Sequence, residues 1–249
     1  MEGSRPGWAC HGQVRIHYLE WGELSPDRPS LLISAGIWEP AERAQSLLSR
    51  LDWPHRVSFS YRGRGQSDTP TSGYDLEDHL GDLEAVVAAT GISRVIILGF
   101  SRGVACALQF ALDHPERTAG VIVGDLPPTQ SRWTPGTAEY WKNMIYLGRP
   151  LTDFIRPQAV DALEREAREV SLWDRLPEIH CPVLILRGLR QDHPIPPNLS
   201  AAESARYLRL LPAAREVGFV HSGHMLPDDE PDEYRRVVQE FLSSLAGEG

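Results

Sequence analysis

The chain has few cysteines, and their placement already limits the protein class. Its 249 residues contain three of them, Cys10, Cys106 and Cys181. They are odd in number and far apart, and no Cys-x-x-Cys pair occurs, so a disulfide framework and a cysteine-bound zinc site are both excluded. We expect a reducing compartment and no metal or other cofactor.

Basic charge and long apolar runs are also scarce. Lys and Arg number 25 against 34 Asp and Glu, which gives a formal net charge of −9. A chain this acidic lacks the basic footprint that binds nucleic-acid phosphates or an anionic membrane. No apolar run reaches the roughly 18 residues of a membrane-spanning helix, and residues 1–12 lack the apolar stretch of a signal peptide. We expect a cytoplasmic monomer or homodimer that acts on a small molecule, with no nucleic-acid or membrane partner.

Short apolar runs alternate with helical patterns along most of the chain. This alternation predicts an α/β fold with a mostly parallel central sheet flanked by helices. The predicted strands are residues 14–21, 31–34, 57–60, 95–98, 121–123, 182–187 and 215–219, and the predicted helices are 40–50, 76–90, 104–112, 198–208 and 231–245.

Residues 127–180 interrupt this alternation. The segment is rich in Trp, Arg and Glu and has helical pieces but no strong strand. We expect one domain, with a core of residues 1–126 and 181–249 and a small helical lid at 127–180. Insertions between sheet elements commonly lie over the functional edge of the sheet, so the aromatic side chains of this lid are expected to shape an apolar pocket.

The sequence Gly99-Phe100-Ser101-Arg102-Gly103 lies between the most hydrophobic predicted strand and the best predicted helix. In that context Gly-x-Ser-x-Gly predicts a sharp turn that presents the serine hydroxyl at the carboxyl edge of the sheet. The glycines keep Cβ atoms away from the adjacent strand and helix. The first amides of the following helix would stabilise negative charge at the same place.

The chain here resembles the α/β-hydrolase superfamily, and four further segments carry the resemblance. They are Leu31-Leu32-Ile33-Ser34-Ala35-Gly36-Ile37-Trp38, which looks like the strand and oxyanion loop; Ser60-Tyr61-Arg62-Gly63-Arg64-Gly65-Gln66-Ser67, a Gly-rich turn; Cys181-Pro182-Val183-Leu184-Ile185-Leu186-Arg187-Gly188, the strand before the acid loop; and His221-Ser222-Gly223-His224, the histidine loop. The resemblance implies the order serine, acid, histidine along the chain.

The resemblance implies that Ser101 is the nucleophile and His224 its base. His221 is a rival, but His224 follows the small residues Ser222 and Gly223, which let its loop approach the serine. For the acid we favour Asp192, although it lies one residue later than the usual spacing. Asp125, at the end of the strand before the insertion, is the alternative.

The oxyanion hole is implied to consist of the backbone N–H groups of Ile37 and Arg102. The side chain of Arg102 is unusual at its position. It would serve either a substrate carboxylate or a structural ion pair, with Asp125 as one partner. The expected substrate-binding residues are Trp38, Phe100, Asp125, Trp133 and Trp141.

The sequence therefore predicts a serine hydrolase that cleaves a small, largely apolar carboxylic ester, lactone or thioester through an acyl-enzyme intermediate. One alternative is a lyase or C–C bond hydrolase that uses the same triad. Another is a non-catalytic small-molecule receptor on the same scaffold.

Overall fold

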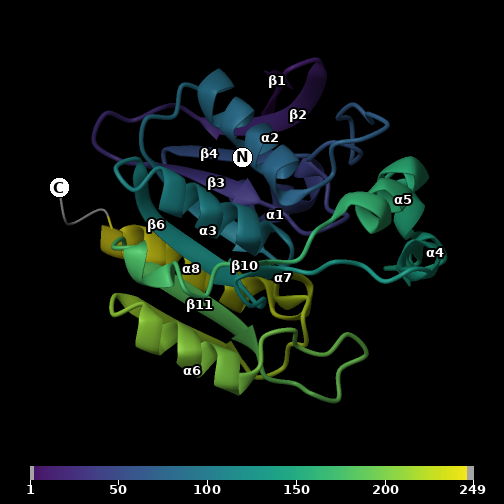
Figure 1. The fold of residues 1–249 in the computed structure, drawn as a ribbon. Coiled ribbons are helices and arrows are strands. Elements are labelled where there is room, and N and C mark those ends of the chain that lie inside the picture. Colours follow the sequence, from purple (N-terminus) through teal and green to yellow (C-terminus); the bar gives the residue numbers. More distant parts are fainter. Residues whose placement is uncertain (1–2, 246–249) are drawn as a thin grey trace.

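The computed structural model describes residues 3–245, and its centre is an eight-stranded sheet (Figure 1). The strand order is β1-β2-β4-β3-β5-β6-β11-β12. Strand β2 runs antiparallel to both its neighbours, and the other pairs are parallel. The strands are β1 (Arg5–His11), β2 (Val14–Gly22), β3 (Ser30–Ser34), β4 (His55–Phe59), β5 (Val95–Phe100), β6 (Thr118–Gly124), β11 (Val183–Gly188) and β12 (Ala214–Phe219). The mostly parallel sheet that the sequence predicts is confirmed.

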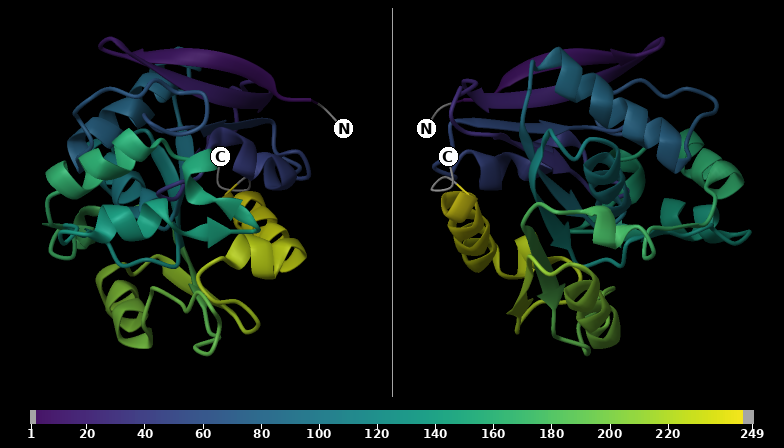
Figure 2. Two further views of the ribbon diagram at one scale, coloured as in Figure 1. Left: turned by 90° about the vertical axis from the view of Figure 1, so that its right-hand side faces the viewer. Right: turned by 60° about the vertical axis from the view of Figure 1, so that its left-hand side comes forward.

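Helices cover both faces of the sheet. One face carries α2 (Leu76–Ala89), α3 (Gly103–Asp113) and α6 (Ala201–Leu210), and the other carries α1 (Gln45–Leu48) and α8 (Pro231–Leu245) (Figures 1 and 2). Neighbouring strand residues alternate between two apolar cores: Leu32 packs under α2 and α3, whereas Leu31 and Ile33 pack under α1 and α8. This alternation follows from the two-residue period of a strand buried on both sides.

Local signals account for helix α2, which precedes strand β5. Asp75 caps α2 in a capping box with Asp78, and Leu83, Val86 and Val87 form its buried stripe. The helix stops before Gly91, which adopts φ +68°, a conformation that glycine tolerates best. The result is a helix whose bounds agree closely with the predicted 76–90.

Two elements differ from the expectation. Strand β1 was not predicted, because only Ala9 is buried among its seven residues and no apolar alternation marks it. The predicted helix 40–50 is instead a 3-10 turn, η1 (Ala41–Ala44), followed by the short α1. The Ala41 N–H donates to Ser60 Oγ at 2.8 Å, which ties the start of this turn to the segment after β4.

The segment between β6 and β11 lies across one end of the sheet. Strands β3 and β11 point toward the side where α4 (Thr137–Lys142) and α5 (Pro157–Glu166) are found (Figure 1). In the left panel of Figure 2 these helices lie toward the viewer, in front of the sheet. We call residues 127–180 the inserted segment. It also contains β7 (Thr129–Gln130), β8 (Ile145–Tyr146), β9 (Arg149–Pro150), β10 (Val170–Ser171) and the 3-10 turns η2 (Leu151–Asp153) and η3 (Leu176–Glu178).

Candidate active site

The turn between β5 and α3 holds Ser101 in a strained backbone conformation. Its φ is +51°, in the left-handed region that non-glycine residues rarely adopt. The Ser101 N–H donates to Gly124 O at 3.0 Å, and its carbonyl accepts from the Val104 N–H at 2.9 Å. Strain of this kind persists only where surrounding contacts impose it, and it clusters at functional sites.

The glycines on both sides of Ser101 are required by close packing. A Cβ atom on Gly99 would lie 2.7 Å from Val104 Cα, and one on Gly103 would lie 2.0 Å from Ser34 O. Both distances are shorter than any real contact of a Cβ atom. The two glycines therefore let strand, turn and helix α3 pack together behind the serine.

His224 is buried beside this turn. Its ring stacks on Phe100, with centroids 5.2 Å apart, and its Nδ1–H donates to Asp125 Oδ2 at 2.8 Å. The residues that the structure describes provide no hydrogen-bond partner for its Nε2, which leaves that nitrogen available for a proton from the cavity side. His221, in contrast, is exposed.

Asp125 is fully buried and has a φ of +47°. Its Oδ1 accepts from the Gly188 N–H at 3.0 Å. Its Oδ2 accepts from the Asn198 N–H at 2.8 Å as well as from His224. Three N–H donors thus fix the carboxylate and stabilise its charge, and the carboxylate in turn orients the imidazole.

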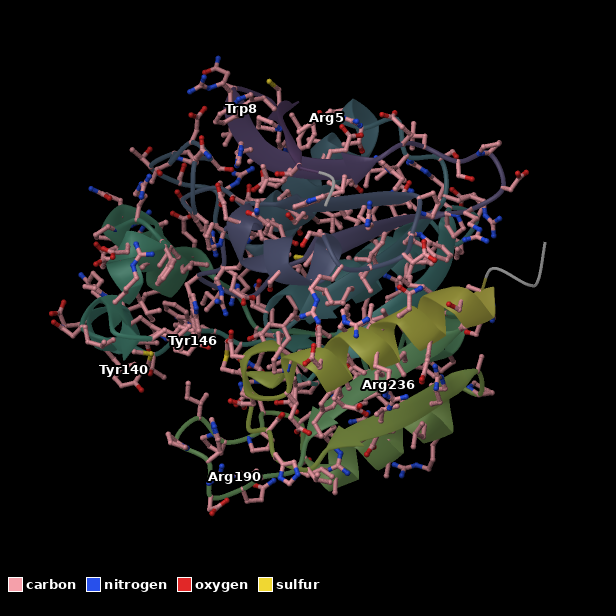
Figure 3. All side chains as sticks on the ribbon, turned by 180° about the vertical axis from the view of Figure 1, so that it is seen from behind. Arg5, Trp8, Tyr140, Tyr146, Arg190 and Arg236 are labelled. Carbon is pink, nitrogen blue, oxygen red and sulfur yellow. The ribbon has the colours of Figure 1, made fainter. Side chains whose placement is uncertain are left out.

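Asp192 does not lie beside His224, so that placement was wrong. Its side chain is 82% exposed, and its carboxylate accepts from Arg190 Nε at 3.1 Å. The His193 N–H donates to Arg190 O at 3.3 Å, and this tight turn directs Asp192 outward. Figure 3 shows Arg190 on the outer loop below the sheet.

The two expected oxyanion donors both lie next to Ser101. Arg102 follows it in the chain, and a Cβ atom on Gly36, which precedes Ile37, would lie 3.4 Å from Ser101 Cβ. Within residues 3–245 neither the Ile37 N–H nor the Arg102 N–H has an acceptor. Two unpaired amides beside a strained serine are what an oxyanion hole requires.

A cavity of about 520 Å³ is lined by Ser101, His224 and the two residues with unpaired amides, Ile37 and Arg102. Trp38, Trp133 and Trp141 line it, whereas Phe100 and Asp125, which were also expected to contact substrate, do not. The sequence did not single out the other wall residues, which come from the start of the inserted segment, between 126 and 144, and from the loop after β11. They are Leu126, Pro127, Thr129, Gln130, Ser131, Tyr140, Met144, Pro194, Ile195, Pro196 and Asn198.

Arg102 does not pair with Asp125. Its Nη2 donates to Gln130 Oε1 at 2.7 Å, and Gln130 Nε2 donates to Asp75 Oδ1 at 2.5 Å. Burial lowers the pKa of Arg102 to about 10. Within the described residues, the Arg102 guanidinium is therefore linked to the Asp75 carboxylate through the Gln130 side-chain amide.

Residues 3–245 hold no group of three or more His, Cys, Asp or Glu side chains that could bind a metal ion. No helix within this range has the length and apolar character needed to cross a bilayer.

Known proteins resemble the chain over nearly its whole length. A model described as "Alpha/beta hydrolase family" matches residues 14–237. A 2-(acetamidomethylene)succinate hydrolase of Mesorhizobium japonicum is 25% identical over 83% of this chain and 72% of its own. An enol-lactonase of Burkholderia xenovorans superimposes with a TM-score of 0.77 at 19% identity, over 95% of this chain and all of its own. An esterase of Thermogutta terrifontis superimposes with a TM-score of 0.76 at 18% identity, over 97% of this chain and 99% of its own. The chain belongs to the alpha/beta hydrolase family.

Proposed function

We propose that the chain is a serine hydrolase that cleaves a small, largely apolar carboxylic ester, lactone or thioester. Ser101 is the nucleophile, His224 the general base and Asp125 the residue that orients the base. The observation that carries the proposal is the 2.8 Å hydrogen bond from His224 Nδ1 to Asp125, because it fixes the tautomer whose Nε2 can accept a proton.

The first half of the reaction acylates the serine. Ser101 Oγ attacks the substrate carbonyl carbon while His224 Nε2 takes the hydroxyl proton. Negative charge moves to the carbonyl oxygen, where the Ile37 and Arg102 N–H groups stabilise it. The tetrahedral intermediate collapses, the C–O bond to the alcohol breaks, and His224 returns the proton to the leaving oxygen.

The second half releases the acid. Water attacks the acyl-enzyme carbonyl as His224 Nε2 takes one of its protons. The bond to Ser101 Oγ then breaks, and His224 reprotonates that oxygen. Asp125 keeps its hydrogen bond to His224 Nδ1 and stabilises the imidazolium formed in each half.

The preference for an apolar substrate rests on the cavity walls. Tryptophan rings from the oxyanion loop and the inserted segment face the same space as Pro194, Ile195 and Met144. Binding against such walls is favourable because it removes apolar substrate surface from water. The relatives named above include an esterase and an enol-lactonase, which supports a carbonyl substrate with an oxygen leaving group.

Turnover of p-nitrophenyl esters from acetate to octanoate tests the proposal, with fluorophosphonate labelling measured in parallel. We expect turnover and labelling in the natural chain and neither in Ser101→Ala. Absence of both in the natural chain would overturn the proposal. Labelling without ester turnover would instead favour the lyase or C–C bond hydrolase, which share the triad.

A further inference from the structure

The oxyanion loop forms a turn that a buried carboxylate closes. The Glu39 N–H donates to Gly36 O at 3.3 Å, and the Gly36 N–H donates to Glu39 Oε2 at 2.8 Å. Ile37, whose N–H is unpaired, lies inside this turn. On the opposite side Arg64 Nε donates to Ile37 O at 2.8 Å. Glu39 therefore holds the peptide units on which the oxyanion hole depends.

Glu39 is held by Arg43, four residues later in the chain, and Arg43 is held in turn by Asp228 from a second segment. Its side chain is buried, and burial raises the pKa of its carboxyl group. Arg43 Nε lies 3.8 Å from Glu39 Oε1, and Arg43 Nη2 donates to both oxygens of Asp228 at 2.8 Å. Asp228 belongs to α7 (Leu226–Asp229), four residues after His224. A buried carboxylate without such a cation would be costly.

The inserted segment reaches the same group of charges. The hydroxyl of Tyr146 in β8 donates to Asp228 Oδ2. The Tyr146 ring also contacts Trp38, with centroids 5.8 Å apart, and Arg43 lies 5.8 Å from that ring. Figure 3 shows Tyr146 on the side of the inserted segment nearest the core and Tyr140 on its outer side. The inserted segment thus contacts the oxyanion turn by ring packing, and it is linked to Glu39 through the hydrogen bonds of Asp228 and the ion-pair contact of Arg43.

We propose that Glu39 is a positioning residue for the hydrolysis, which holds the Ile37 N–H toward the oxyanion, and that Tyr146 supports it through Asp228 and Arg43. The inference rests on the proposed function, because it assigns the Ile37 amide to the oxyanion hole. It gives the inserted segment a part in the chemical step as well as in substrate binding.

Kinetics of Glu39→Ala, Glu39→Gln and Tyr146→Phe test this. Loss of one oxyanion donor typically lowers kcat by about 10²–10³, so we expect a loss of about 100-fold in Glu39→Ala, with KM within about threefold. Glu39→Gln keeps an acceptor for the Gly36 N–H and should recover part of the loss. Tyr146→Phe keeps the ring but removes the hydroxyl, and we expect a loss in kcat of about threefold to tenfold, the size of one hydrogen bond.

Inhibition by an alkyl boronic acid separates positioning from general structural damage. The boronate forms a tetrahedral adduct on serine that places an oxygen in the oxyanion hole. Its Ki should therefore rise in proportion to the fall in kcat/KM across the three variants. Asp232→Asn is the control, because it breaks only the exposed Arg50–Asp232 ion pair nearby, and it should leave kcat and Ki unchanged.

Two results would overturn the inference. One is a Tyr146→Phe enzyme with natural kcat and natural boronate Ki. The other is a Glu39→Ala enzyme whose loss lies in KM alone. If Glu39→Ala does not fold, Tyr146→Phe decides. A natural chain that neither turns over esters nor reacts with a fluorophosphonate would remove the proposed function, and this inference with it.

Discussion

Asp125 and His224 are 99 positions apart in the chain, yet the carboxylate of one accepts the Nδ1–H of the other at 2.8 Å. The carboxylate comes from the end of β6 and the imidazole from the loop after β12. Strand β11 lies between those two strands in the sheet. The amide of Gly188, at the end of β11, also donates to Asp125. The acid is thus fixed by the sheet itself.

The two candidate acids predict opposite results on mutation. Asp125→Asn would change the hydrogen bond that sets the histidine tautomer, and by analogy with other triads we expect kcat to fall by about 10⁴. Asp192→Asn alters an exposed pair with Arg190, and kcat should stay within about twofold. Steady-state ester hydrolysis by both variants is the measurement. A large loss in Asp192→Asn with little loss in Asp125→Asn would contradict the assignment.

Backbone strain at Ser101 predicts that activity and stability oppose each other there. Glycine adopts φ +51° without the steric cost of a Cβ atom. We therefore expect Ser101→Gly to be more stable than Ser101→Ala by about 1 kcal/mol, while both are inactive. Denaturant unfolding of the two variants measures the difference. Equal free energies of unfolding would contradict the presence of strain.

The aromatic wall predicts a chain-length effect. Trp141 lines the cavity and packs against Trp38 and Trp133. In Trp141→Ala we expect KM for an octanoate ester to rise about tenfold, about 1.4 kcal/mol of lost apolar contact, with a smaller effect on acetate. Trp8→Ala, an exposed tryptophan of β1, is the control (Figure 3). Equal effects on both esters would argue against an apolar acyl site.

A buried histidine predicts sensitivity to acid. Burial, and next the Arg64 cation, lower the pKa of His79 well below 6.5. His79 Nδ1–H donates to Asp75 O, and its Nε2 accepts from Arg64, so the ring is neutral. Below about pH 6.5 the unfolded chain takes up a proton that the folded chain excludes. The free energy of unfolding should therefore fall, by at most about 1.4 kcal/mol per pH unit from this group.

Urea unfolding between pH 7.5 and 5 measures this slope. His79→Gln should show a flatter decline than the natural chain, whatever its absolute stability. His180→Gln, which changes an exposed histidine, should keep the natural slope. Identical slopes in the natural chain and His79→Gln would contradict the prediction.

The fold was predictable where the signals are local. The turn at Ser101 is marked in the sequence by Gly99 and Gly103, which its close packing requires. The central strands are marked by continuous apolar runs, because they are buried on both faces of the sheet. Strand β1 could not be found in this way, because it lies at the sheet edge and pairs only with β2. Its stability comes from a neighbour and not from its own apolar pattern.

The choice of the triad acid and the role of Glu39 at the oxyanion turn depend on long-range contacts, which the spacing of residues in the sequence does not reveal. Asp125 and Asp192 both follow predicted strands, and the choice between them depends on how the turn at 190–193 closes. Glu39 is linked to Asp228 through Arg43, and the Arg43–Asp228 pair is separated by 185 positions in the chain. The one local signal for Glu39 was an acidic side chain within a loop that must approach the serine closely.

The most direct test of the account is the intact mass of the chain after reaction with a fluorophosphonate, followed by mapping of the modified peptide. We predict one adduct per chain, on Ser101, no adduct in Ser101→Ala, and strongly slowed labelling in Asp125→Asn. An unmodified natural chain, or an adduct that persists in Ser101→Ala, would contradict the assignment of Ser101 as the nucleophile.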